Sequence, residues 1–224
     1  MPIGAPEQEG PLSDPTVTLG CMARIALFHS VLGVRQGISD AADSLRSAGH
    51  EVLVVDQYGG RSFDDYEEAG RFAADIGFPH ALMRSALAAI ADEPGPIVTA
   101  GFSNGAGMAE YIAAARGGSA GGVLGSLQFA GALPLPMFGL EGWPADTPVQ
   151  LHYAAEDPMR ADEWITPFLD SVRAAGSPCE AFLDYRGGHL FTDPSRPGEY
   201  DERSAAEAMR RALDFLDRLD HDPA

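Results

Sequence analysis

Short apolar runs alternate with segments of helical periodicity along most of the chain. The runs are rich in β-branched residues and carry few charges, as strands buried on both faces of a parallel sheet do. The segments between them repeat apolar residues at helical spacing, so the order predicts an α/β fold with a mostly parallel sheet and helices on both faces. Six strand candidates follow from the runs, at residues 24–28, 52–56, 97–101, 123–129, 149–154 and 179–185.

Apolar stripes mark the first and the last helix. One stripe runs along residues 34–48, and the other runs along residues 205–219. Such stripes are typical of helices that cover one face of a sheet. At the start of the last helix, Ser204 and Glu207 have the spacing of a capping box.

The chain has 224 residues without an internal repeat or a central linker rich in Pro, Gly or Ser, which predicts one domain over residues 21–224. Residues 1–20, rich in Pro, Gly and acidic side chains, are expected to form a flexible tail. This tail lacks the pattern of a secretory signal, so a cytoplasmic location is expected. Residues 117–140 are uncharged over a length that could span a membrane, but glycines and prolines interrupt them and favour a strand and a loop.

Acidic residues outnumber basic ones by 33 to 15, which gives a formal net charge of −18. A surface of this sign repels nucleic-acid phosphates and anionic bilayers, so neither is expected as a partner. Every cation is an arginine, and the lack of lysine excludes Schiff-base, pyridoxal-phosphate and Walker-type phosphate-loop chemistry. Cys21 and Cys179 are expected to be small packing residues, and the sequence shows no metal-binding cluster of His and Cys.

Two serines lie in a Gly-x-Ser-x-Gly pattern, Ser103 and Ser119. A nucleophilic serine needs a tight turn between a buried strand and a helix, so that its hydroxyl projects above the sheet. Ser103 follows the apolar run 97–101 and precedes a strong helix former, whereas Ser119 follows a helix and precedes a strand. Ser103 is therefore the candidate nucleophile, and an ordinary strand-to-helix turn is the alternative.

A serine hydroxyl reacts only when a base takes its proton and a carboxylate orients that base. His189 follows the last strand candidate in a glycine-containing loop, and the other histidines fit less well. Asp157, preferred over Glu156, ends a strand at the carboxyl edge of the sheet, where ligand sites of open α/β sheets lie. The order Ser103, Asp157, His189 is the order of nucleophile, acid and base in α/β-hydrolases. A helix N-cap is the alternative for Asp157, and a structural loop histidine is the alternative for His189.

An acyl-transfer site also needs two donors for the developing oxyanion. The backbone N–H of Asn104, directly after the candidate nucleophile, is expected to be one of them. The N–H of Val31, in the loop after the first strand, is expected to be the other. His29 in that loop either lines the pocket or is a buried structural histidine.

Five segments of the chain carry a resemblance to a known family: residues 28–34, residues 55–58, the turn at Ser103, residues 154–157 and residues 188–191. In order and spacing they resemble the dienelactone hydrolase family, and the resemblance extends from about residue 23 to residue 219. It implies one α/β-hydrolase domain without a large lid, which cleaves an ester or lactone through a covalent acyl-enzyme.

Three positions depart from the family pattern. Ser103 stands where the best-known members have a cysteine, and Ser30 stands where they have a glutamate in the first loop. Asp193 replaces an arginine four residues after the base, and Arg61 is a counterpart of the other substrate-binding arginine, one residue out of register. An anionic dienelactone would therefore meet fewer cations, so neutral esters are expected ahead of anionic lactones.

The sequence thus predicts a serine hydrolase that cleaves a small carboxylic ester, lactone or thioester and needs no metal or organic cofactor. Acyl transfer or perhydrolysis by the same triad is an alternative, and so is a non-catalytic ligand-binding protein of this fold. A monomer or small homo-oligomer is expected. The predicted substrate-binding residues are Leu32, Tyr58, Arg61 and Phe102, together with part of the loop 133–143.

Overall fold

The computed structural model describes residues 22–117 and 122–221. The expected tail, Cys21 and the competing serine, Ser119, lie outside these residues. The described strands form one sheet in the order β2-β1-β3-β4-β5-β6, and every neighbouring pair is parallel. Their bounds are β1 (Arg24–Phe28), β2 (Glu51–Val55), β3 (Ile97–Phe102), β4 (Val123–Phe129), β5 (Val149–Ala154) and β6 (Cys179–Tyr185).

The predicted α/β fold is confirmed, and four of the six strands have the expected bounds. Strand β2 is shifted by one residue at both ends, and β3 ends one residue later than expected. The uncharged stretch 117–140 contributes β4 and a short 3-10 helix, η1 (Leu135–Phe138), as far as it is described. No helix in the described part of the chain is both long and apolar enough to cross a membrane.

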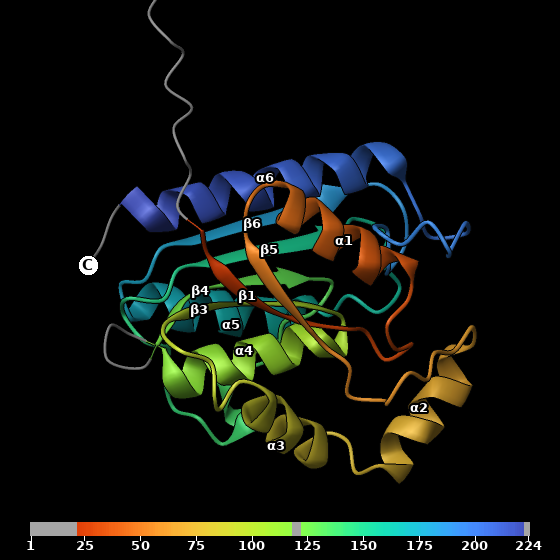
Figure 1. The fold of residues 1–224 in the computed structure, drawn as a ribbon, viewed down its shortest axis with the longest axis horizontal. Helices are drawn as coiled ribbons and strands as arrows, with labels where there is room; N and C mark the ends of the chain where they lie inside the picture. The colour runs from red at the N-terminus through yellow and green to blue at the C-terminus, as the bar shows by residue number, and fades with distance from the viewer. Residues whose placement is uncertain (1–21, 118–121, 222–224) are drawn as a thin grey trace, which may run out of the picture.

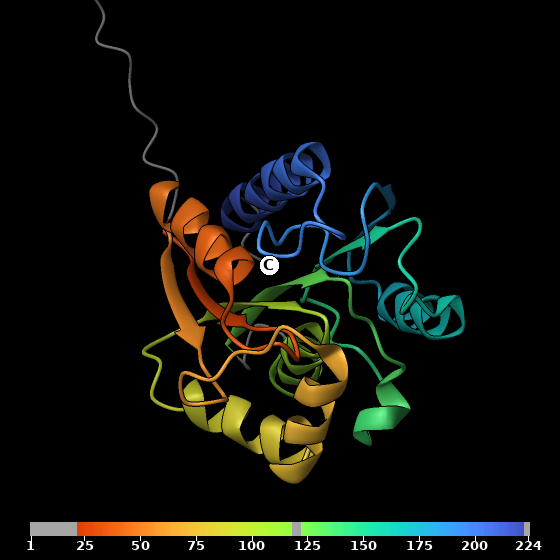
Figure 2. The ribbon, with the colours of Figure 1, turned by 90° about the vertical axis from the view of Figure 1, so that its right-hand side faces the viewer.

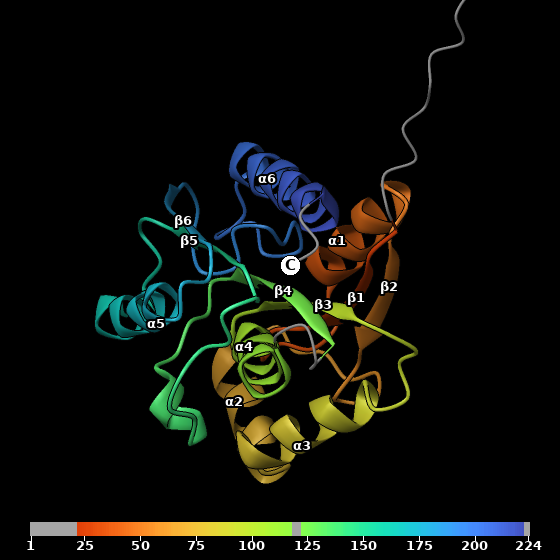
Figure 3. The same cartoon turned by 90° about the vertical axis from the view of Figure 1, so that its left-hand side faces the viewer.

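Helices cover both faces of the sheet (Figure 1). Helices α1 and α6 lie on one face, and α2, α3, α4 and α5 lie on the other (Figure 2 and Figure 3). Strand β1 shows why two cores form: Ile25 and Leu27 pack beneath α1 and α6, whereas Ala26 and Phe28 pack on the opposite side. The helix bounds are α1 (Gln36–Ser47), α2 (Tyr66–Asp75), α3 (His80–Ala89), α4 (Asn104–Arg116), α5 (Asp162–Ala174) and α6 (Glu202–His221).

The expected capping box of α6 is wrong. The Asp201 side chain accepts the N–H of Ser204 at 2.9 Å, so the aspartate caps this helix. The Ser204 hydroxyl instead accepts the N–H of Arg186 at 2.9 Å, and Glu207 pairs with Arg211 at 2.7 Å. The serine therefore fastens α6 to the segment that follows β6.

The loops after β1, β3, β5 and β6 gather at one edge of the sheet, because parallel strands all end on the same side (Figure 2). This is the edge at which open α/β sheets bind their ligands. Every segment that the sequence singled out for chemistry reaches it.

Candidate active site

Ser103 lies in the turn between β3 and α4 with φ 56° and ψ −121°. A positive φ is uncommon for a residue with a side chain, and it persists only where the surroundings hold it. Here the Ser103 N–H donates to the carbonyl of Phe129 at 2.8 Å, and the Ser103 carbonyl accepts the N–H of Ala106 at 2.9 Å. The half-buried serine is thus fixed between the neighbouring strand and the first turn of α4.

Three glycines leave room for this turn. A Cβ on Gly101 would lie 2.1 Å from the carbonyl oxygen of Gly105, and one on Gly105 would lie 2.4 Å from the carbonyl oxygen of His29. A Cβ on Gly131 would lie 2.3 Å from the carbonyl oxygen of Ser103. Sequence reasoning found the first two and missed Gly131. Its only signal in the sequence is a glycine just after a buried strand.

Ser103, His189 and Asp157 form one hydrogen-bonded chain. His189 Nε2 lies 2.7 Å from Ser103 Oγ, and His189 Nδ1 lies 2.8 Å from Asp157 Oδ2. Because the carboxylate can only accept, Nδ1 carries the proton and Nε2 is free to accept from the serine hydroxyl. His189 and Asp157 are 4% and 6% exposed, which keeps the link between them away from water.

The helix-cap alternative for Asp157 does not hold. Helix α5 begins at Asp162 after Ala161, and no side chain caps it. Asp157 instead accepts the N–H of Met159 at 2.8 Å through the oxygen that His189 does not use. This second contact fixes the carboxylate plane toward the imidazole.

Val31 and Asn104 are the residues whose backbone N–H groups are expected to hold the oxyanion, and Asn104 directly follows Ser103. Gly33 N–H donates to the Ser30 carbonyl at 3.0 Å, and Leu32 N–H donates to the Ser30 hydroxyl at 3.2 Å. Among the described residues, the amides of Val31 and Asn104 find no protein acceptor. Both donors are therefore available to an external oxygen, and Asn104 opens α4, whose N-terminus favours negative charge.

His29 is a buried structural histidine, the second of its two expected roles. Its Nε2 accepts the N–H of Gln57 at 3.1 Å, so its Nδ1 carries the proton and donates to the Ser30 carbonyl at 2.7 Å. Burial lowers the pKa of His29, against the opposing effects of the Ser30 carbonyl and of Asp56. A neutral His29 thus ties the loop of Val31 to the loop after β2.

Three of the four predicted substrate-binding side chains are buried, contrary to the expectation. Leu32 is 0% exposed, and Phe102 is 3% exposed, with its ring stacked on Phe129 at 4.5 Å on the side of α1 and α6. Tyr58 is also buried, and its ring meets His29 edge-on at 4.6 Å. Arg61 is exposed, and its guanidinium lies 5.2 Å from the ring centre of Phe72 in α2.

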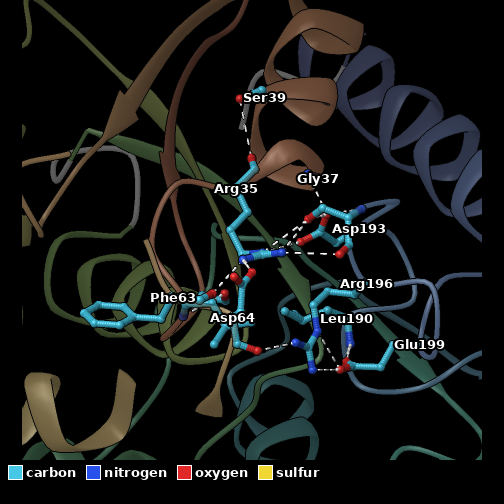
Figure 4. A network of polar contacts seen from close by, with 12 residues as sticks. Arg35, Gly37, Ser39, Phe63, Asp64, Leu190, Asp193, Arg196 and Glu199 are labelled. Carbon is cyan, nitrogen blue, oxygen red and sulfur yellow. Dashed lines mark hydrogen bonds and ion pairs between the residues drawn. The ribbon is translucent and has the colours of Figure 1, made fainter. Parts of the chain in front are cut away.

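Asp193, expected to place a negative charge at the site, is 4% exposed, and its carboxylate is hydrogen bonded and paired within the protein. Its carboxylate accepts the N–H groups of Gly37 and Ser195 at 3.0 and 2.9 Å and pairs with Arg35 at 3.3 Å (Figure 4). Arg35 also contacts Asp64 at 2.7 Å. Sequence reasoning missed this network because its partners lie far apart along the chain.

Comparisons with known proteins agree with the fold. The model of the dienelactone hydrolase family matches residues 19–219. Among solved structures, a dienelactone hydrolase-like promiscuous phosphotriesterase from metagenomic libraries is similar with a TM-score of 0.72 and 20% identity, covering 89% of this chain and 87% of that chain. Esterase 2 of Thermogutta terrifontis, phosphonylated by cyclosarin, has a TM-score of 0.60 and 15% identity, covering 92% of this chain and 86% of that chain. The Bacillus cereus carboxylesterase has a TM-score of 0.52 and 16% identity, covering 88% of this chain and 89% of that chain. No curated protein matches the sequence.

Proposed function

The chain belongs to the dienelactone hydrolase family, and on that premise we propose that it hydrolyses a small neutral carboxylic ester, lactone or thioester through an acyl-enzyme on Ser103. The observation that carries the proposal is the chain of hydrogen bonds from Ser103 through His189 to Asp157, with links of 2.7 and 2.8 Å. The link from Ser103 to His189 is short enough for proton transfer, and the link from His189 to Asp157 orients the imidazole.

In the acylation step, Ser103 Oγ attacks the acyl carbon while His189 Nε2 takes the hydroxyl proton. Asp157 stabilises the imidazolium that forms. The negative charge on the former carbonyl oxygen is held by the N–H groups of Val31 and Asn104. The bond from carbon to the leaving oxygen or sulfur then breaks, and His189 returns the proton to the leaving group.

In the deacylation step, water replaces the leaving group. His189 takes a proton from the water, whose oxygen attacks the acyl carbon, and the same two N–H groups hold the second oxyanion. The bond to Ser103 Oγ then breaks, and the proton on His189 restores the serine hydroxyl. The protein itself supplies every group that these two steps require.

Neutral substrates are proposed because two arginines that contact the loop of His189 are already paired with carboxylates. Arg35 pairs with Asp64 and Asp193, and Arg196 pairs with Glu199. Arg61 is exposed, lies over the Phe72 ring and has no carboxylate partner among the described residues. The Asp193 charge is itself buried and paired with Arg35. A higher kcat/KM for p-nitrophenyl acetate than for a p-nitrophenyl ester with a free carboxylate is expected, and the reverse order would contradict the proposal.

Turnover of p-nitrophenyl acetate by matched serine variants tests the function. Ser103→Ala is expected to lower kcat by about 1,000-fold or more, because removal of a nucleophile removes the covalent route. Ser119→Ala, in the second copy of the motif, is expected to keep the wild-type rate. A Ser103→Ala protein that retains most of the activity would contradict the proposal.

A further inference from the structure

His189 lies in a segment of the chain, residues 186–201, that contains no strand and has only the cap of α6 at its end. One residue of the segment, Glu199, is hydrogen bonded to two earlier residues of the same segment. Glu199 accepts the N–H of Gly188 at 2.8 Å through its backbone carbonyl and the N–H of Leu190 at 2.8 Å through its carboxylate. The two residues that flank His189 are thus both hydrogen bonded to Glu199.

The Glu199 carboxylate uses both of its oxygens. The oxygen that accepts from Leu190 also accepts from the Tyr66 hydroxyl at 2.8 Å, and the other oxygen accepts from Arg196 at 3.0 and 2.6 Å (Figure 4). Burial would raise the pKa of Glu199, but the hydrogen bonds from Leu190, Arg196 and Tyr66 outweigh it, and the pKa is lowered. The group is therefore an anion with a fixed set of donors.

The same contacts connect the base to α2. Tyr66 is the first residue of that helix, and its ring lies edge-on to the His189 ring with a centroid distance of 6.1 Å. The Arg196 guanidinium lies over the Tyr66 ring, 4.9 Å from its centre. Glu199 thus links the segment that carries His189 to the helix beside it.

We propose that Glu199 is a positioning residue for His189, which holds the backbone on both sides of the imidazole so that the ring keeps its contacts with Ser103 and Asp157. This inference rests on the proposed function. A displacement of about 1 Å in a catalytic group can lower the rate about 100-fold. The loss should fall on kcat, because the Glu199 side chain is hydrogen bonded to the segment of the base and has no hydrogen bond to Ser103, Val31 or Asn104.

The test compares Glu199→Gln with Glu202→Gln. Both remove one negative charge, but Glu202 is exposed and makes no hydrogen bond or ion pair within the described chain. Glu199→Gln places an amide N–H₂ against a donor and is expected to lower kcat about 10- to 100-fold with KM changed less than about threefold. Glu202→Gln is expected to match the wild type. Circular dichroism and thermal melting establish that each variant is folded.

A second variant and a second readout keep the test decisive. Tyr66→Phe removes one donor to the carboxylate but keeps the ring, and it is expected to lower kcat about two- to tenfold. The downfield proton NMR signal of the His189 Nδ1–H is expected to broaden in Glu199→Gln, which does not depend on turnover.

The outcomes separate this inference from the proposed function. A folded Glu199→Gln protein with wild-type kcat, or one in which only KM rises, would overturn the inference and leave the hydrolase proposal intact. If Glu199→Gln does not fold, a wild-type kcat in Tyr66→Phe would overturn it. A wild-type protein that cleaves no ester would overturn both.

Discussion

The nucleophile and the base are held in place by different kinds of contact. Ser103 is fixed by backbone hydrogen bonds and by glycines at which any side chain would collide with a neighbouring carbonyl. His189 is fixed by a loop whose shape depends on charged side chains, above all Glu199 and Asp193. The comparison teaches that steric packing determines one half of this site and electrostatic pairing determines the other. The two halves should therefore respond differently to substitution and to pH.

The largest effect is expected from adding one methyl group to the turn of Ser103. In Gly105→Ala the new Cβ would lie 2.4 Å from the His29 carbonyl oxygen and 2.5 Å from the Phe28 carbonyl oxygen, both backbone atoms. We expect the free energy of unfolding to fall by about 3 kcal/mol, because overpacking there forces the backbone to move. Urea unfolding measures the loss of stability, and ester turnover measures the loss of activity.

Gly70→Ala is the matched control for that substitution. Gly70 lies in α2 with nothing within 4 Å of the position of a Cβ, so alanine there is expected to leave activity unchanged and to stabilise the helix slightly. Wild-type stability in Gly105→Ala would show that sterics do not determine the nucleophile half.

A smaller effect is expected from removing the buried charge of the base half. Asp193→Asn turns an amide toward Arg35 and weakens the contacts with Gly37 and Ser195, so we expect a loss of about 2 kcal/mol in unfolding free energy. The ratio of kcat/KM for neutral and anionic esters should not change, because the Asp193 charge is already paired with Arg35.

Asp64→Asn provides the comparison on the same arginine. The Asp64 side chain is 95% exposed, and exposed ion pairs contribute about 0 to 1 kcal/mol to the free energy of unfolding. Asp64→Asn is therefore expected to lower that free energy by no more than this amount. If Asp193→Asn speeds the turnover of anionic esters, its charge acts on the substrate, and the structural interpretation of Asp193 fails.

The third effect is the change of folding stability with pH, which is expected to have opposite signs for a carboxyl group in each half of the site. Glu110, in the helix that follows Ser103, is fully buried, and burial raises its pKa well above 4.5 against the hydrogen bond from Leu133. The folded protein then keeps a proton that the unfolded chain has released, so stability falls as pH rises from about 4.5 toward the pKa of the folded state, by up to about 1.4 kcal/mol per pH unit. Glu110→Gln should flatten this slope in urea unfolding measured from about pH 5 to pH 8.

Glu199 should behave in the opposite way. Its pKa is lowered in the folded state, so its contribution to stability is present above the pKa of an unfolded glutamate and is lost as pH falls through the folded pKa. Equal pH slopes for the wild type and Glu110→Gln would contradict the assignment of a protonated Glu110.

The sequence was sufficient to predict the strands and the three residues that form the hydrogen-bonded chain. These features are local: an apolar run, a glycine-flanked serine and polar residues where strands end. The contacts of Gly131 and Arg35 were not predicted because their partners are distant in the chain. Those of Glu199 are mostly with nearby residues, but they lie in a segment without a strand or a regular helix, where no periodic pattern marks them. The burial of Leu32 and Phe102 was not predicted, because an apolar residue beside a catalytic one gives the same sequence pattern whether it faces the core or the substrate.

Covalent labelling tests the central claim most directly, that Ser103 is a nucleophile activated by His189 and Asp157. The protein is treated with a fluorophosphonate, and the modified peptide is located by mass spectrometry in the wild type, Ser103→Ala and His189→Ala. We expect one adduct, on Ser103, which disappears in Ser103→Ala and forms far more slowly in His189→Ala. No adduct on the folded wild type, or an adduct that persists in Ser103→Ala, would contradict the account.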